Sequence, residues 1–478
     1  MPRGAASLSL GSLRERGMGA SVLVAALSSA FGVVLISATG FIGAMLRADP
    51  YVGDSGTLAF VLSFLTTLLV GVAVYVAAIV TANTFSTVVA GRTRRIALLR
   101  LIGASARSQR REVAQQGLVV GVIGAFVGLV AGTLLSAAGV AILTAVLGLD
   151  GVSYSVVQAS LLLPAVIVAL TTWTAAWAGS RRVLAVTPLQ ALGGSVEASR
   201  ETVARRSGRN ITALVLFIVG GALLALGILA GLVTPLGVMI AFVGGILSFT
   251  GLALGATLVM PPVLRLVGRW FGSSATARLA AENALRYPER SSRMAIGVVM
   301  GVTLVTMFAV ALETVKAVLT VSAGGELPDE IGTVIDSFAA IMMGLVGVSA
   351  VIAAVGLVNL LTLGVVQRRR ELGLLRALGL SNAQVRRVVL LEAAHLTIAA
   401  LITGLVLGVV YGWAGAQSLL GSVPIDPEAP RVMNFVAPAV PFWPVVVIIA
   451  ATALLTLVAT VVPTRLATRV APVEALAE

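Results

Sequence analysis

The sequence predicts an all-α integral membrane protein with about ten transmembrane helices. Three observations predict this fold: a strongly apolar composition, ten segments long enough to cross a bilayer, and arginine confined almost entirely to one side of them. Of the 478 residues, 58% are hydrophobic and only 11% are charged, whereas soluble domains carry about 25% charged residues. A water-soluble fold cannot bury this much apolar surface. Soluble enzymes, secreted domains and disordered chains are therefore excluded.

Ten apolar segments are the expected membrane spans. A spanning helix needs about 20 mostly apolar residues, because the hydrocarbon core is about 30 Å thick. The expected limits are 19–46, 57–83, 115–147, 157–178, 211–231, 236–262, 294–313, 336–365, 391–420 and 441–463. The first segment follows two arginines as a signal peptide would, but it is too long for one. We expect it to be a retained span, with cleavage near Ala30 as the alternative.

The basic residues predict the orientation of these spans. Thirty of the 33 lie near the N-terminus, in the connections after spans 2, 4, 6 and 8, or in the C-terminal tail. The other side has only Arg47, Lys316 and Arg431. The positive-inside rule then places both termini in the cytoplasm, for a multi-pass protein of the cell (inner or plasma) membrane. The net charge of +13 reflects this topology and attraction to anionic membrane lipid, and no nucleic-acid partner is expected.

Several chemistries are missing from the sequence. Cysteine is absent and His395 is the only histidine, so neither a Cys-ligated metal nor a two-His metal site is possible. Lys316, the only lysine, lies between Val315 and Ala317, so the chain has no Gly-Lys-Ser/Thr phosphate-binding loop. We assign no catalytic residue, no metal and no cofactor to the chain, and ATP hydrolysis is not expected of it.

A long internal repeat is the most informative feature. One copy, from Asn83 to Val113, reads NTFSTVVAGRTRRIALLRLIGASARSQRREV; the other, from Asn359 to Val389, reads NLLTLGVVQRRRELGLLRALGLSNAQVRRVV. They align without a gap at an offset of 276 residues. The polar and glycine positions that coincide include Arg94 with Arg370, Arg100 with Arg376, Gly103 with Gly379 and Ser105 with Ser381. Chance similarity between apolar helices would not keep such residues in register, so we infer a duplication.

The ends of the copies complete a 4+2+4 plan. Thr187-Pro-Leu-Gln-Ala-Leu192 follows span 4, and Ala471-Pro-Val-Glu-Ala-Leu476 follows span 10. The expected organisation is a cytoplasmic amphipathic segment (1–18), a first four-span unit (19–192), a cytoplasmic linker (193–210), a linker pair of spans (211–262), a second amphipathic segment (263–293) and a second four-span unit (294–478). The two units run in the same direction, so their pseudo-twofold axis should lie along the membrane normal.

The connection after span 8 predicts two helices joined by a sharp break. Leu374 and Leu378 recur at helical spacing, and Gly379 suits the left-handed residue that ends a helix. Ser381 with Gln384 fits a capping box that starts the next helix. An apolar stripe on a short cytoplasmic helix favours a partner surface. The alternative is a solvated basic loop whose leucines lie on the inner leaflet.

These residues resemble a known family. The pattern of arginines, Glu-Leu-Gly-Leu-Leu-Arg-Ala-Leu-Gly, a serine, and spans ending in Ala-Pro-Val-Glu-Ala-Leu is similar to the FtsX-like permeases, the membrane subunits of MacB-type (type VII) ABC transporters. The 4+2+4 layout resembles permeases of the bacitracin-efflux type. The resemblance implies two pseudo-symmetric FtsX-like units and a separate ABC ATP-binding subunit that binds ATP and Mg²⁺, with two copies per permease chain. It assigns the coupling role to Arg94, Arg95, Leu98, Leu99, Arg100, Gly103 and Ser105, and to Arg370, Glu371, Leu374, Leu375, Arg376, Gly379 and Ser381.

Two departures from the family pattern matter. The family usually has a large extracytoplasmic domain between the first two spans of a unit, and the expected outer connections here are too short for one. Arg95 also stands where the second copy has Glu371, so the first docking site is atypical.

Two further groups of residues inside the spans are candidates for a role: a set of glycines and a pair of ionisable residues. Small residues on one helix face allow close helix packing, and the expected packing glycines are Gly124, Gly128, Gly132, Gly404, Gly408 and Gly412. Glu392 and His395 lie one helical turn apart, and ionisable residues in a span are functional candidates. We favour the simpler interpretation, a headgroup-level Glu392 facing water with a core histidine behind it.

The leading functional hypothesis is an ABC exporter permease for an amphipathic or hydrophobic substrate, energised by the separate ATPase. One alternative is a permease that passes ATP-driven motion to an extracytoplasmic partner without transporting anything. Another is an ion-coupled secondary transporter, which would normally show buried carboxylates near the middle of a span.

Overall fold

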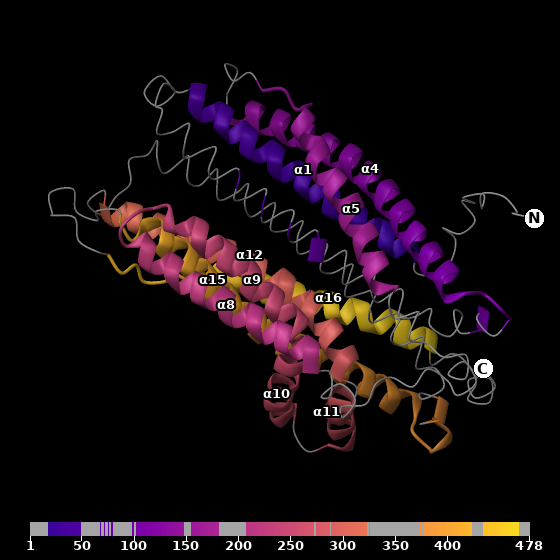
Figure 1. Cartoon of the computed structure of the whole chain (residues 1–478). Coiled ribbons are helices and arrows are strands. Elements are labelled where there is room, and N and C mark those ends of the chain that lie inside the picture. The colour runs from indigo at the N-terminus through magenta and orange to yellow at the C-terminus, as the bar shows by residue number, and fades with distance from the viewer. Residues whose placement is uncertain are drawn as a thin grey trace, which may run out of the picture. The chain divides into compact units, whose positions relative to one another are not determined.

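The computed structural model describes residues 18–48, 102–147, 154–180, 207–271, 274–286, 288–322, 376–422 and 434–467, together with positions 67, 71, 75, 78, 79, 98, 99, 325, 373 and 374. Within this part of the chain all regular structure is helical, with ten α-helices and two short 3-10 turns. Contacts divide the chain into two compact units, Met1–Val196 and Glu197–Glu478. Figure 1 labels the helices of both units.

The described helices agree with eight of the ten expected spans. By length and composition, seven can cross a membrane: Ser21–Met45, Ala106–Ala145, Ala159–Gly179, Gly208–Gly231, Gly237–Leu254, Met294–Val321 and Asn382–Leu420. The eighth, Phe442–Val458, is a shorter apolar helix. The expected spans 57–83 and 336–365 lie outside the described residues, apart from isolated positions. The chain is thus a multi-pass membrane protein.

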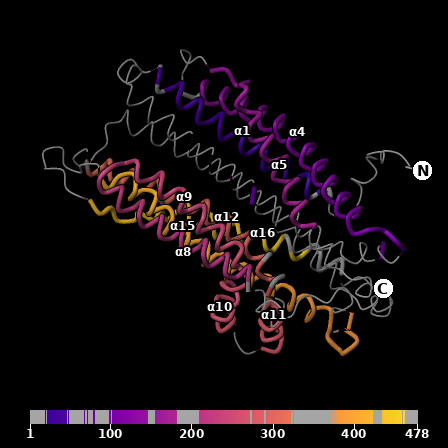
Figure 2. The backbone as a smooth tube through the Cα atoms, in the orientation of Figure 1, coloured from indigo at the N-terminus to yellow at the C-terminus, as the bar shows by residue number. Residues whose placement is uncertain are grey.

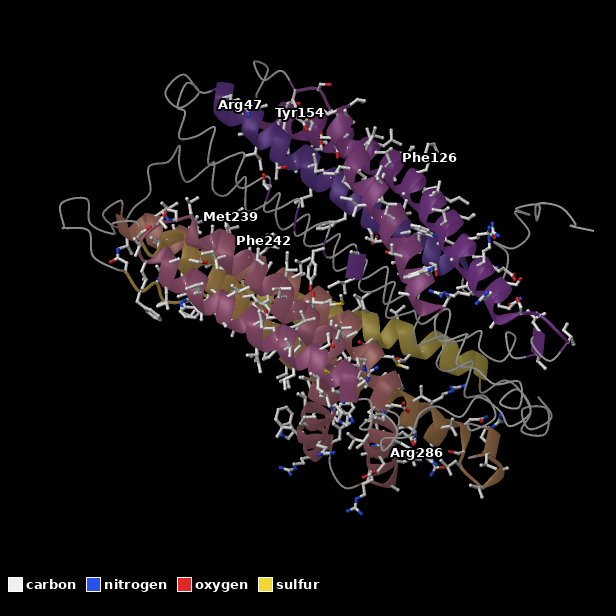
Figure 3. All side chains as sticks on the ribbon, viewed as in Figure 1. Arg47, Phe126, Tyr154, Met239, Phe242 and Arg286 are labelled. Carbon is white, nitrogen blue, oxygen red and sulfur yellow. The ribbon has the colours of Figure 1, made fainter. Side chains whose placement is uncertain are left out.

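Three long helices form the described part of the first unit. Helix α1 (Met18–Ala48) packs against α4 (Ala106–Leu147) and α5 (Leu162–Gly179), and α4 packs against α5. A 3-10 turn, η2 (Ala159–Leu161), leads into α5. Just before it, the Tyr154 hydroxyl donates a hydrogen bond of 2.9 Å to the backbone carbonyl of Ser37 in α1. Figure 3 labels Tyr154 and Arg47 near the same end of this unit.

The second unit has a larger helical core. Helices α12 (Pro288–Ser322) and α15 (Asn382–Leu420) form its main pair, and α16 (Phe442–Ala467) packs against both. Helices α8 (Ser207–Gly231) and α9 (Gly237–Leu254) form a tight hairpin that also contacts α15. Figures 1 and 2 show these five helices running side by side.

The sixth expected span is shorter than the sequence suggested. We expected one helix over 236–262, but α9 ends at Leu254, Gly255 interrupts it, and α10 (Ala256–Gly268) follows. Pro261 and Pro262 in α10 also lack backbone N–H groups. Composition could not reveal the break, because the residues on both sides of Gly255 are equally apolar. Helix α10 and the amphipathic α11 (Ala275–Arg286) project from the long helices in Figure 2.

The first and third spans pack in the same register in both units. In the first unit, a Cβ atom added to Gly132 would lie 2.9 Å from atoms of Ala30. In the second unit, the glycine 276 residues later, Gly408, faces Thr306, which is itself 276 residues after Ala30. Gly128 on Ala26 and Gly404 on Val302 are related in the same way. The duplication therefore extends through the first span of each unit, where sequence identity no longer reveals it.

Candidate functional site

The connection between the second and third spans of each unit ends in the same turn. In the first turn (Leu98 to Ser105), Gly103 has a φ of +101°; in the second turn (Leu374 to Ser381), Gly379 has a φ of +99°. A residue with a side chain rarely adopts such angles, so both positions favour glycine. The Ala104 N–H donates to the Leu99 carbonyl at 2.9 Å in the first turn. This bond is typical of a left-handed helix end.

Each turn is followed at once by an N-capped helix. In the second turn Ser381 Oγ accepts from the Gln384 N–H at 3.2 Å, and the Gln384 side chain accepts from the Ser381 N–H at 2.9 Å. The expected capping box is therefore present. In the first turn Ser105 Oγ accepts from the Ser108 N–H at 3.1 Å, without the reciprocal bond that a glutamine would make. Helices α4 and α15 thus start rigidly from equivalent serines.

Large aliphatic side chains stand exposed at matched positions of the two turns. Leu98 is 49% exposed and Leu374, its repeat partner, is 53% exposed. Ile102 and Leu378, one helical turn later, are 82% and 71% exposed. The equivalent backbone bonds, from Ile102 N–H to the Leu98 carbonyl and from Leu378 N–H to the Leu374 carbonyl, place each pair on one helix face. These four exposed side chains form two apolar patches, one on each turn.

The structure locates eight of the fourteen expected coupling residues. It places Leu98, Leu99, Gly103, Ser105, Leu374, Arg376, Gly379 and Ser381 in the two turns. The remaining members, Arg94, Arg95, Arg100, Arg370, Glu371 and Leu375, lie outside the described residues. Ile102 and Leu378 were not among the expected coupling residues although they are the most exposed aliphatic side chains of the turns. The apolar stripe in the sequence, which predicts a docking surface, could have identified both residues.

The glycine faces connect these turns to the rest of each unit. On α4, Gly124, Gly128 and Gly132 lie against the backbone of α1; on α15, Gly404, Gly408 and Gly412 lie against α12. Added Cβ atoms would be within about 3 Å of neighbouring atoms at all six positions. Helix α4 is therefore packed closely on α1, and α15 on α12, along a seam of small residues. The register of this packing is the same in both units.

Glu392 and His395, the two ionisable residues singled out in α15, are both buried. His395 is 1% exposed, and its Nε2 lies 2.5 Å from the carbonyl oxygen of Leu264 near the end of α10. A carbonyl only accepts, so Nε2 carries the proton. The ring of Phe271 lies 5.2 Å from the imidazole. His395 is thus the core residue we favoured, but Glu392 is only 9% exposed, so the expectation that it faces water is wrong.

Comparison with known proteins supplies the family. The sequence profile of the FtsX-like permease C-terminal family matches residues 67–188 and 343–472. Similar proteins include the ABC transporter permeases YtrF (33% identical over 66 residues) and YknZ (32% over 100 residues), both from Bacillus subtilis (strain 168). The macrolide export ATP-binding/permease protein MacB of Rhodopirellula baltica is 29% identical over 102 residues.

These relatives are matched over short segments. The aligned parts cover 13%, 21% and 20% of this chain and 15%, 24% and 15% of the three relatives. The family profile, in contrast, matches more than half of the chain and does so twice. Each match covers one of the two turns and the helices that follow it. The chain therefore belongs to the FtsX-like permease family and carries two FtsX-like domains.

Proposed function

We propose that the protein is the permease subunit of an ABC exporter, driven by a separate ATP-binding subunit that docks on both turns. The observation that carries the proposal is the matched pair of apolar patches, Leu98 with Ile102 and Leu374 with Leu378. Covering one large aliphatic side chain fully yields about 1.5–3 kcal/mol. The three relatives named above are all ABC transporter permeases or contain one, which supports an ATPase partner.

The mechanism follows from how the turns are built. A capped turn with a left-handed glycine resists bending, so a movement of the ATPase surface passes into the first residues of α4 and α15. Each of these helices is locked to a first-span helix by its glycine face. ATP binding and hydrolysis, with Mg²⁺, take place in the partner, and this chain supplies the levers. One chain holds both levers, so one permease pairs with two ATPase copies.

The proposed substrate is an amphipathic or hydrophobic molecule that enters sideways from the bilayer. Its support is the expected shortness of the outer connections, which leaves no external receptor domain. Both termini are proposed to be cytoplasmic, on the arginine distribution. One matched relative is named as a macrolide export protein, which agrees with this class of substrate.

Cysteine labelling tests the docking directly, because the native chain has no cysteine. Ile102→Cys and Leu378→Cys should react with a maleimide in the isolated permease and lose at least tenfold in rate when the ATPase is bound. Val157→Cys is the matched control, since Val157 is 78% exposed and lies at the other end of its unit. Equal labelling of Ile102→Cys and Leu378→Cys with and without ATPase would show that docking occurs elsewhere.

Transport assays separate export from mechanotransmission. Vesicles containing the complex should accumulate an amphipathic compound in an ATP-dependent manner. A complex that hydrolyses ATP in response to a partner, yet moves no compound from a broad panel, would favour mechanotransmission instead.

A further inference from the structure

Helix α10, the 3-10 turn η4 (Arg269–Phe271) and α11 form an elbow with an exposed face. This face is separate from the two proposed docking turns. Large apolar side chains recur on it every four residues: Leu258 is 46% exposed, Leu266 is 51% exposed and Trp270 is 66% exposed. Pro262 fills the remaining position of the stripe and is also exposed. The opposite face of α10, with Met260 and Leu264, is buried. The helix is therefore apolar on both sides.

Arginines flank the exposed stripe where it ends. Arg265 and Arg269, one helical turn apart beside Leu266 and Trp270, are both exposed. On α11 the alanine face is buried, and Arg278 is exposed. In the first unit Trp177 is 44% exposed, and the Arg110 guanidinium lies 4.6 Å from the centre of its ring. Trp270 is more exposed, at 66%, and lies beside two exposed arginines.

The position of the elbow suits the membrane boundary. Helix α9 has 18 residues and is about 27 Å long at 1.5 Å per residue, close to the thickness of the hydrocarbon core. Helix α10 starts where α9 has completed its crossing, on the side that the arginines assign to the cytoplasm. The Arg209 guanidinium near the start of α8 donates to Thr257 Oγ1 at 2.9 Å, so both helix ends lie at this level. Tryptophan and arginine are typical of the headgroup region.

We propose that this face binds an anionic phospholipid of the inner leaflet, with an acyl chain along Leu258 and Leu266 and the headgroup phosphate at Arg265 and Arg269. A lipid fits better than a protein partner because the stripe continues the exposed apolar surface of α9, where Leu254 is 42% exposed. Guanidinium groups suit phosphate oxygens, and the chain has no acidic side chain between Arg209 and Glu282.

The site has a structural consequence for α15. The Leu264 carbonyl accepts from buried His395, so α10 is fixed to α15, and α11 packs on α15 as well. A lipid on the outer face of α10 would therefore hold the elbow against the helix that starts at the second turn. We therefore expect anionic lipid to affect the second unit, through α15, more than the first.

Lipid titration of the full-length detergent-solubilised permease tests the proposal. The probes are fluorescent phosphatidylglycerol and, for comparison, fluorescent phosphatidylcholine. Each arginine near an anionic headgroup contributes about a fivefold change in affinity, so Arg265→Gln/Arg269→Gln should bind phosphatidylglycerol about 25-fold more weakly. Phosphatidylcholine binding should not change. The matched control is Arg107→Gln/Arg111→Gln, which removes the same charge from exposed positions of α4 and should change phosphatidylglycerol binding by less than twofold.

A second readout places the lipid at Trp270. Phosphatidylglycerol brominated on its acyl chains should quench tryptophan fluorescence less in Arg265→Gln/Arg269→Gln than in the native protein. Trp270→Phe should abolish this difference, because the other exposed tryptophans lie away from the two arginines in the sequence, whereas inorganic phosphate should neither quench nor compete. Equal weakening by the two arginine pairs would mean diffuse charge attraction and would overturn the site. Displacement of the brominated lipid by the ATPase would also overturn it, because the face would then be a protein contact.

Discussion

Helix α4 in the first unit and α15 in the second pack in the same way on the first-span helix of their unit, but their opposite faces differ. Both begin at a capped turn after a left-handed glycine, and both place glycines on a first-span helix in one register. Their outer faces differ. Tyr411 of α15 hydrogen-bonds Ser248 of α9 at 3.0 Å, and Ser418 lies against Gly231 of α8. At the equivalent positions α4 has Leu135 and Ile142, which are 59% and 62% exposed.

This difference shows which features the duplication kept. Small residues preserve the close contact with the first-span helix, and they recur at the same spacing in both units. The outer face is free to diverge, so polar or small residues appear where the α8–α9 hairpin packs and large aliphatic residues where it does not. The two units thus share one helix contact and differ in what packs on the other face of α4 and α15.

The largest expected effect concerns the unequal charges of the two connections. Glu371 and Arg95 occupy equivalent sequence positions outside the described residues. If identical ATPase copies meet both sites, Glu371→Arg should leave an uncompensated charge in the second site at a cost of about 3–5 kcal/mol. ATP-driven transport should then fall more than 100-fold, and Arg95→Glu should have a much smaller effect. ATPase stimulation and transport in both variants measure this, and a larger loss from Arg95→Glu would reverse the asymmetry.

The glycine register should be equally important in both units. Gly132→Ala and Gly408→Ala should each destabilise the protein by about 1–3 kcal/mol, because the added methyl group meets Ala30 in one case and Thr306 in the other. Gly139→Ala and Gly415→Ala are matched controls on the same two helices, with open space at the new methyl group. They should be neutral or stabilising by up to about 1 kcal/mol. Thermal unfolding in detergent measures the stability of all four variants. Equal stability of the control variants and the variants at packed glycines would refute the close helix packing.

The helix caps should differ slightly between the units. Ser381→Ala removes a reciprocal box and should lower protection of the start of α15 by about 1 kcal/mol, whereas Ser105→Ala removes one bond and should cost about half as much. Hydrogen exchange of residues 382–388 and 106–112 measures each cap locally. Gln384→Ala should reduce the second cap to the level of the first, and no change in that variant would argue against the box.

An effect of similar size is expected where Tyr154 contacts the first span of its unit. Burial raises the pKa of Tyr154 above its usual value near 10, and the hydrogen bond with Ser37 opposes this rise. The folded state thus favours the protonated hydroxyl, and its contribution, present below pH 10, is lost as pH rises further. The corresponding contact in the second unit, from Ala439 N–H to Thr314 Oγ1, has no titrating group. Tyr154→Phe should cost about 0.5–1.5 kcal/mol at pH 7 and abolish the alkaline loss. Unfolding of both proteins at pH 7 to 11 measures this, and the same alkaline loss in Tyr154→Phe would exclude Tyr154 as its source.

Sequence reasoning reached different depths in different regions. The second turn could be predicted in detail, because Gly379, Ser381 and Gln384 act through local backbone geometry. The break at Gly255 could not, since glycine is common inside these spans and hydropathy is continuous across it. The helix that packs on each glycine face also could not be predicted from the sequence. Ala30 and Thr306 share a position but not a side chain, so the register of the two first spans within the expected four-span units became visible only in the packing.

The central claim is that one chain supplies two equivalent levers for two ATPase copies. Native mass spectrometry of the detergent-purified complex with its ATPase tests it most directly. The account predicts one permease chain with two ATPase chains, falling to one permease with one ATPase when Leu374→Asp/Leu378→Asp removes the second apolar patch. A complex of two permease chains with two ATPases would contradict it.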